Sequence, residues 1–221
     1  MLEVARLLAR PLIETLVMVI ASTSIALIAG GAVGIGLFIM SNQRLSGISP
    51  VLRYAKHAAD RIINVLRSFP FIILMVIVLP LSRLIVGTSI GTIAAIVPLS
   101  VAASPFIARI VESSLSEIDG GVIDAAFACG ARKGRILFAI LVPEALPALV
   151  SGLTLTMISL VGYSAMAGVI GGGGLGDLAI RYGYQRFRTD IMLAAVLTII
   201  VLVEGLQALG TTVVKKLKDS R

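Results

Sequence analysis

Few residues of this chain have side chains suited to catalysis or metal binding. It contains one cysteine, Cys129, and one histidine, His57, and two such residues cannot supply the ligands that a protein zinc site needs. No Ser-His-Asp arrangement typical of hydrolases accompanies them, and no G-x-x-x-x-G-K-[ST] motif for holding ATP phosphates occurs in the sequence. We therefore expect no catalytic residue, no metal and no cofactor on this chain, and any energy source must lie on a partner.

A glycine-rich segment is the next candidate for ligand binding. Gly171, Gly173 and Gly176 have the spacing of the dinucleotide-binding motif G-x-G-x-x-G. That motif works at the turn between a strand and a helix of a βαβ unit, and the sequence predicts no strand before these glycines. We interpret the segment as a flexible external turn.

The elements that must position these residues are hydrophobic helices. The 221 residues are 57% hydrophobic and 14% charged, with a mean hydropathy of +1.03, whereas soluble domains contain about 25% charged residues. The uncharged run of residues 68–82 is too short to cross a ~30 Å hydrocarbon core. The span that contains it must therefore begin near Ile62 and include Arg67, whose side chain can extend to the membrane interface. We predict an all-α membrane protein with one transmembrane domain over residues 1–221. Its five spans are expected at about 12–40, 62–82, 88–108, 147–170 and 191–209.

Basic residues predict the orientation of these spans. Alternate connecting segments hold twelve and six Lys or Arg residues. The richer set comprises residues 41–61, 109–146 and 210–221, and the poorer set comprises residues 1–11, 83–88 and 177–190. Because cytoplasmic segments are richer in Lys and Arg, we expect the N-terminus outside and the C-terminus in the cytoplasm. The net charge of +7 then reflects this bias and attraction to the lipid bilayer, and no nucleic-acid partner is expected, since the basic residues do not cluster on a polar domain.

Small residues predict close packing between helices. Gly30 with Gly34 has small-xxx-small spacing on the first span, and so does Ala32 with Gly36. Such pairs let two helix backbones approach each other in lipid, and they carry no information about a substrate.

The long loop of residues 109–146 mixes charged and apolar residues at helical spacing. Asp119 is suited to start a helix, and Gly130 is suited to end it in a left-handed cap. Five residues between them are expected to form an apolar knob: Val122, Ile123, Ala125, Ala126 and Phe127. Such a knob can dock in a groove of a partner protein or lie on lipid. Asp119, Asp124 and the absence of Lys and Arg from 113 to 131 favour the protein partner.

The order of residues in this loop resembles a known signature. Asp124-Ala125-Ala126 is followed after three residues by Gly130 and after nine more by Ile140-Leu141-Val142-Pro143. The pattern resembles the EAA signature of ABC-importer permeases, E-A-A-x3-G-x9-I-x-L-P, with Asp124 in place of Glu and Val142 in place of Leu. The resemblance implies a coupling helix that seats in a groove of a separate ATPase, which binds ATP and Mg. The residues implied in this coupling are Asp124, Ala125, Ala126, Phe127, Gly130, Arg132 and Pro143.

Over most of residues 12–210 the chain resembles the methionine-importer branch of that family. The segments that carry it are 67–74, 86–91, 103–109, 160–166, the Gly-Gly-Leu-Gly turn and Tyr182-Gly183-Tyr184. Arg132-Lys133 departs from the branch, which more often has a small or hydroxyl residue there. The resemblance implies a type I ABC-importer permease fold and import of D- and L-methionine across a bacterial inner membrane by alternating access. It also implies an extracytoplasmic binding lipoprotein that delivers the substrate near residues 80–90 and 171–190.

Five helices are too few to enclose a path for an amino acid, so we expect a homodimer around a two-fold axis, served by two ATPase subunits. Residues with small or soft side chains are expected to line the translocation pathway. They are Tyr163, Ser164, Ala165 and Met166, with Ser104 and Pro105 on the opposing helix. Ordinary helix packing is the alternative for these residues.

Two other classes of membrane protein, secondary transporters and scaffold subunits, are alternatives to an importer permease. A secondary transporter is expected to carry intramembrane acids or inverted repeats, whereas Arg67 and Glu204 form no pair suited to a proton or ion relay. A scaffold subunit without transport would need the same spans and the same docking loop. The substrate of an importer could also be another amino acid or a short peptide, since recognition can reside in the binding protein.

Overall fold

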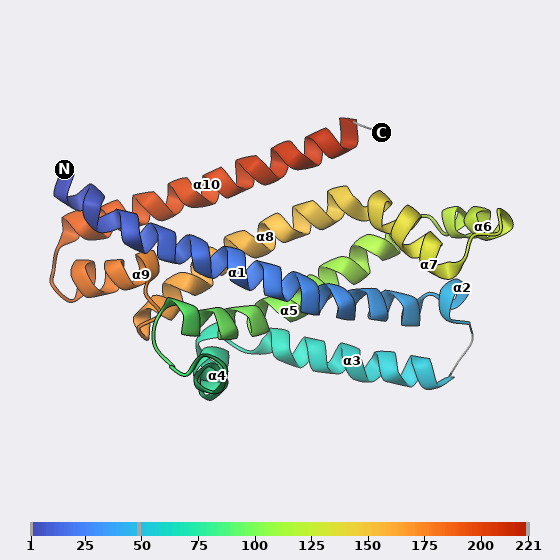
Figure 1. Ribbon diagram of the computed structural model, residues 1–221, viewed down its shortest axis with the longest axis horizontal. Coiled ribbons are helices and arrows are strands. Elements are labelled where there is room, and N and C mark those ends of the chain that lie inside the picture. Colours follow the sequence, from blue (N-terminus) through green and yellow to red (C-terminus); the bar gives the residue numbers. More distant parts are fainter. Residues whose placement is uncertain (1, 48–49, 220–221) are drawn as a thin grey trace.

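The computed structural model describes residues 2–47 and 50–219, and these residues form helices and connecting turns without a strand (Figure 1). The all-α prediction is confirmed. Helices satisfy their backbone polar groups internally, which suits a chain this apolar. In chain order the elements are α1 (Leu2–Ser41), α2 (Gln43–Ser46), α3 (Pro50–Ser68), α4 (Phe71–Val86), α5 (Thr92–Ser116), α6 (Gly120–Ala128), α7 (Lys133–Arg135), η1 (Ile136–Leu141), α8 (Val142–Val169), α9 (Gly174–Leu178), η2 (Ala179–Tyr184) and α10 (Thr189–Asp219).

Four of the described helices are long and apolar enough to cross a membrane alone. They are α1, α5, α10 and the continuous helix made by α7, η1 and α8. The fifth predicted span, residues 62–82, is divided between α3 and α4, which meet at an angle of 106°. The predicted segment is thus a bent pair of helices and not one straight helix. Pro70 accounts for the break, because it has no backbone N–H to donate and disfavours helical backbone at Phe69.

The close contact between α1 and α5 forms the centre of the bundle. A Cβ on Gly30 would collide with the carbonyl oxygen of Ser104, and a Cβ on Gly34 would collide with that of Ala108. The predicted packing role of these two glycines is confirmed. Gly36 differs, because a Cβ there would meet no atom within 4 Å.

The two ends of the molecule carry different elements. The start of α1 lies beside α9 and η2 at one end, whereas α2 and α6 lie at the other (Figure 1). At the first end the backbone N–H groups of Gly174 and Leu175 donate to Glu14 Oε2 and Thr15 Oγ1, both at 2.9 Å. The prediction of a flexible turn is therefore wrong for this part of the glycine segment, because it forms the buried helix α9 against α1.

Candidate functional site

Helix α6 is a short helix with a defined start and a defined end. At its start, Asp119 Oδ1 accepts a hydrogen bond from Gly121 N at 2.5 Å. At its end, Gly130 has φ +76°, and the backbone N–H of Ala131 donates to Ala126 O at 3.0 Å. A positive φ of this kind suits glycine, which has no Cβ to clash. The predicted helix start and left-handed cap are confirmed.

The two faces of α6 differ in exposure. Ile123 and Ala126 are buried against the rest of the protein, as their spacing of three residues on a helix allows. Asp124 and Ala125 are exposed, and Phe127 is half-buried. The apolar knob is therefore smaller than predicted, and Ala126, although implied in coupling, lies on the inner face. The surface open to a partner presents the Asp124 carboxylate beside small side chains.

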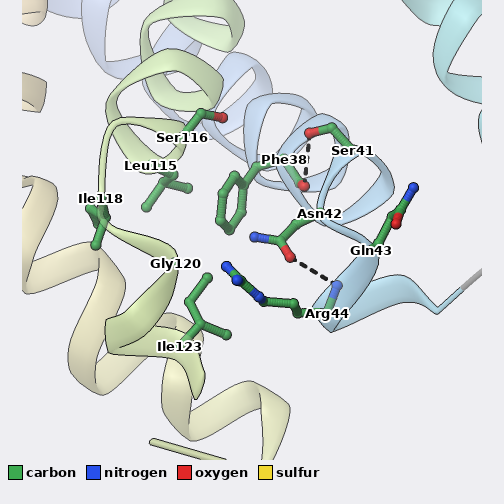
Figure 2. Close-up of a pocket in the computed structure, with 10 residues that line it drawn as sticks. All are labelled: Phe38, Ser41, Asn42, Gln43, Arg44, Leu115, Ser116, Ile118, Gly120 and Ile123. Carbon is green, nitrogen blue, oxygen red and sulfur yellow. Dashed lines mark hydrogen bonds between the residues drawn. The ribbon is translucent and has the colours of Figure 1, made fainter. Parts of the chain in front are cut away.

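Arg44 joins α6 to the end of α1, a contact that sequence reasoning missed. Its Nε lies 3.0 Å from Asp124 Oδ1. Figure 2 shows the guanidinium extending from α2 toward Gly120 and Ile123 of α6. A Cβ on Gly120 would lie 2.7 Å from Arg44 Cζ and closer still to Nη1, so the guanidinium uses the space that a side chain would fill. Asn42 Oδ1 accepts a hydrogen bond from Arg44 N and starts α2, but this local cap does not reveal the contact with α6.

A cavity of about 570 Å³ adjoins this contact. It is bounded by the end of α1, by α2, by the last turn of α5 and by α6 (Figure 2). Its apolar side is formed by Phe38, Leu115 and Ile118, and Arg44 lies at its polar side. The cavity separates the start of α6 from the end of α1, so the ion pair of Arg44 bridges an otherwise open gap.

Arg132 and Pro143 belong to the helix that follows α6. Arg132 precedes α7, and Pro143 is an exposed residue in the first turn of α8. Between them η1 has π-helical hydrogen bonding, in which Val142 N donates to Leu137 O. A π-helix is wider than an α-helix, and Pro143 contributes to its formation here. Proline has no backbone N–H and so cannot donate the hydrogen bond that an α-helix requires at its position. Of the signature's residues, the structure therefore places Asp124 to Gly130 on α6 and its cap, and Pro143 on α8.

Tyr163 is the predicted pathway residue that lies at a cavity. Its ring stacks on Phe71, the first residue of α4, with centroids 4.6 Å apart and planes 10° apart. Tyr163 also lines a cavity of about 120 Å³ between α5 and α8, opposite Phe106. Phe106 in turn lies under the guanidinium of Arg67, with Cζ 5.0 Å from the ring centroid. Arg67 is thus held at the α3–α4 break beside an aromatic ring.

The other predicted pathway residues are distributed over different surroundings. Ser164 is buried and donates to Val161 O within α8, while Ala165 packs against Gly176 of α9 and Met166 is exposed. On α5, the backbone of Ser104 faces Gly30 of α1, and Pro105 is buried. Within one chain, neither Ser104 nor Pro105 lines the cavity at Tyr163, where α5 instead presents Ala103, Phe106 and Ile110.

A cluster of four charged residues fastens α3 to α5. Lys56 Nζ lies 3.0 Å from Asp60 Oδ2 and 3.2 Å from Glu112 Oε1. Arg109 Nη1 lies 3.0 Å from Asp60 Oδ1 and 2.6 Å from Glu112 Oε2. The Glu112 side chain is only 9% exposed. Sequence reasoning placed Arg109 in a loop, whereas α5 continues to Ser116 and brings these charges together.

A groove of about 460 Å³ lies at the α9 end of the molecule. Its lining includes Glu14, Thr92, Asp177 and Arg181. Arg181 forms an ion pair with Asp177, and this hydrogen bond and charge raise the pKa of Arg181 above its ordinary value. The groove thus combines opposite charges, which suits contact with a polar protein surface. No group of three or more His, Cys, Asp or Glu residues suited to a metal occurs in the described part of the chain.

These features define a helical membrane component with a short capped helix, α6, at one end. Residues 46–218 match the family described as binding-protein-dependent transport system inner membrane component, and the chain belongs to that family. It is 43% identical over 203 residues to the probable D-methionine transport system permease protein MetI of Vibrio cholerae, covering 92% of this chain and 88% of the relative. It is 46% identical over 205 residues to the protein of the same name from Haemophilus influenzae, covering 92% and 93%.

A solved structure extends the comparison to three dimensions. It is described as an inward-facing conformation of the MetNI methionine ABC transporter in the CY5 native crystal form. It matches with a TM-score of 0.90 and 42% identity, covering 96% of this chain and 97% of the other. The type I ABC-importer permease fold and the resemblance to methionine-importer permeases are confirmed. Both relatives are named as permease proteins of a D-methionine transport system.

Proposed function

We propose that this chain is the permease subunit of an ATP-driven importer that moves D- and L-methionine across the bacterial inner membrane. The observation that carries the proposal is α6, a capped helix that bears the EAA-like signature and presents Asp124 at one end of the membrane-helix bundle. The names of relatives that are 43% and 46% identical support methionine as the substrate. The chain itself would transport without catalysing a reaction.

The energy for transport would come from two ATPase subunits, which bind ATP and Mg, beneath a homodimer of this chain. Each α6 would seat in a groove of one ATPase. Only residues 117–119 connect α6 to α5, and only residues 129–132 connect it to α7. Connectors this short leave little slack, so a displacement of α6 would move α5 and α8. The two halves of the dimer would then alternate between inward-facing and outward-facing states as rigid bodies.

The opposite end of the chain would receive substrate from an extracytoplasmic binding protein. The groove at Glu14, Asp177 and Arg181 supports this assignment, because its mixed charges suit a transient protein contact. The N-terminus would then lie outside and the C-terminus in the cytoplasm, as the distribution of Lys and Arg predicts.

Methionine would cross between the two copies of the chain as a zwitterion with an apolar side chain. Tyr163, Ser164, Ala165 and Met166 are proposed to contribute to this path, with Ser104 and Pro105 nearby in the assembled dimer. Tyr163 has the clearest support, because it lies at a cavity and touches α4 at the α3–α4 break. A change in that bend would open or close the space beside its ring.

Reconstitution tests the proposal directly. Proteoliposomes that contain this chain, its ATPase and its binding protein should accumulate labelled L- and D-methionine only when ATP is supplied. Unlabelled methionine should compete, whereas other amino acids and a dipeptide should not. Competition by another amino acid instead would assign a different substrate, uptake without ATP would indicate a secondary transporter, and no uptake of any substrate would indicate a scaffold subunit.

A variant at the end of α6 tests the coupling part of the proposal. Gly130→Leu forces a branched side chain into a backbone with φ +76°, which distorts the cap of α6. Methionine uptake should fall while ATP hydrolysis by the assembled complex continues. Gly205→Leu is the control, because a Cβ there meets no atom within 4 Å. Normal uptake by Gly130→Leu would contradict the assignment of α6.

A further inference from the structure

Helix α6 packs against the rest of the chain through one face. Among its nine residues only Ile123 and Ala126 are buried. The cavity described above leaves the start of α6 open toward α1 (Figure 2). These two side chains, with half-buried Phe127, fix which face of α6 points inward, but the cavity leaves the start of the helix without packing on its α1 side. The exposed side chain of Asp124 is therefore held in place by a contact from outside α6.

Arg44 supplies that contact from a fixed base. The start of α2 is capped by Asn42, whose Oδ1 accepts a hydrogen bond from Arg44 N at 3.0 Å. Gly47 N donates to Gln43 O at 2.9 Å and closes the turn. Leu45, the next residue, is buried in the core. The backbone of Arg44 is thus held on both sides, and its guanidinium reaches α6 from a defined origin.

The ion pair itself adds little to stability. Its side chains are 48% and 58% exposed, and exposed ion pairs are screened by water and salt. Its geometry is nevertheless specific, because the guanidinium crosses Gly120 at a place where any Cβ would displace it. A weak contact that fixes an orientation fits a helix that must meet a partner.

We propose that Arg44 is a positioning residue, which orients the Asp124 face of α6 for the ATPase and links the movement of α6 to α1. The inference rests on the proposed function, since it assumes that α6 is the element that the ATPase moves. Arg44 would act through Asp124 and Gly120 without itself contacting the substrate.

Two different substitutions should have the same effect. Arg44→Ala removes the guanidinium, and Gly120→Ala leaves every charge in place but pushes the guanidinium away from Asp124. Alanine at the first position of a helix does not disfavour the helix. We expect each variant to lower methionine uptake per ATP hydrolysed by about three- to tenfold, with the melting temperature of the permease unchanged. The double variant should be no worse than either single variant, because both remove one contact.

Matched controls and a defined set of outcomes complete the experiment. Arg53→Ala removes an exposed cation from α3, and Gly36→Ala adds a Cβ where no atom lies within 4 Å, so both should behave as wild type. Loss of ATPase binding by both test variants at an unchanged melting temperature would also support positioning. Normal coupling in either test variant, an additive loss in the double variant, or a lowered melting temperature would overturn the inference. Absence of methionine uptake by the wild type would instead count against the proposed function.

Discussion

The close packing of α1 on α5 makes a prediction that can be scaled from the structure. Gly30→Ala places a Cβ against the carbonyl oxygen of Ser104, and Gly34→Ala places one against that of Ala108. The obstructing atoms belong to the backbone, so no side chain can rotate away, and the two helices must separate locally. Overpacking of this kind costs about 1–3 kcal/mol. In a chain of this size that corresponds to a fall in melting temperature of about 2–12 °C.

Neighbouring glycines on the same helix provide the control. A Cβ on Gly31 or Gly36 would meet no atom within 4 Å, so Gly31→Ala and Gly36→Ala should not lower stability and should raise it by up to about 1 kcal/mol, because alanine favours a helix over glycine. Each variant would be purified in detergent, heated in steps, and measured by the fraction that remains monodisperse in size-exclusion chromatography. Equal melting temperatures for Gly30→Ala and Gly31→Ala would refute the close α1–α5 contact.

Three further predictions concern other contacts. Thr15→Val removes the hydroxyl that accepts from buried Leu175 N, and the unsatisfied N–H should lower stability by about 1–3 kcal/mol in the same heating assay; an unchanged melting temperature would exclude this bond. Glu112→Gln weakens the charged cluster between α3 and α5 and should lower stability by about 1–3 kcal/mol. The control Asp190→Asn, at an exposed ion pair, should have no measurable effect, and equal behaviour of the two variants would contradict the role of the cluster. Cys129, the only cysteine and exposed, should react with a membrane-impermeant maleimide in inside-out vesicles and not in right-side-out vesicles; the reverse pattern would invert the orientation.

Much of the helical framework was predictable because its signals are local. An apolar run long enough to cross a membrane identifies a span wherever its neighbours lie, as in α1, α5, α8 and, with Glu204 inside it, α10. The ends of α6 were also predictable, since Asp119 and Gly130 act on backbone groups within a few residues of themselves. The break at Pro70 had a local signal too, but run length alone predicted one helix there.

The details of the candidate site depended on contacts that sequence spacing does not reveal. The faces of α6 show this most directly, because Ala126 belongs to the signature yet lies against the protein. Ser104 and Tyr163 were both expected at one path, but in one chain the backbone of Ser104 packs on Gly30. Which side of a lipid-embedded helix faces a neighbour is poorly marked by hydrophobicity, since lipid and protein interior are similarly apolar.

By itself, the sequence determined the kind of protein this is: an all-helical membrane chain with a short capped helix and the signature of an importer permease. These properties follow from composition, from the length of apolar runs and from motif spacing. All three can be read without knowing which residues come into contact in the folded protein. Only the tertiary structure decided that Arg44 meets Asp124, and that Glu14 binds the amide of Gly174, 160 residues away. Such pairings depend on how whole helices pack, and that packing is a sum of many weak contacts with no single marker in the chain.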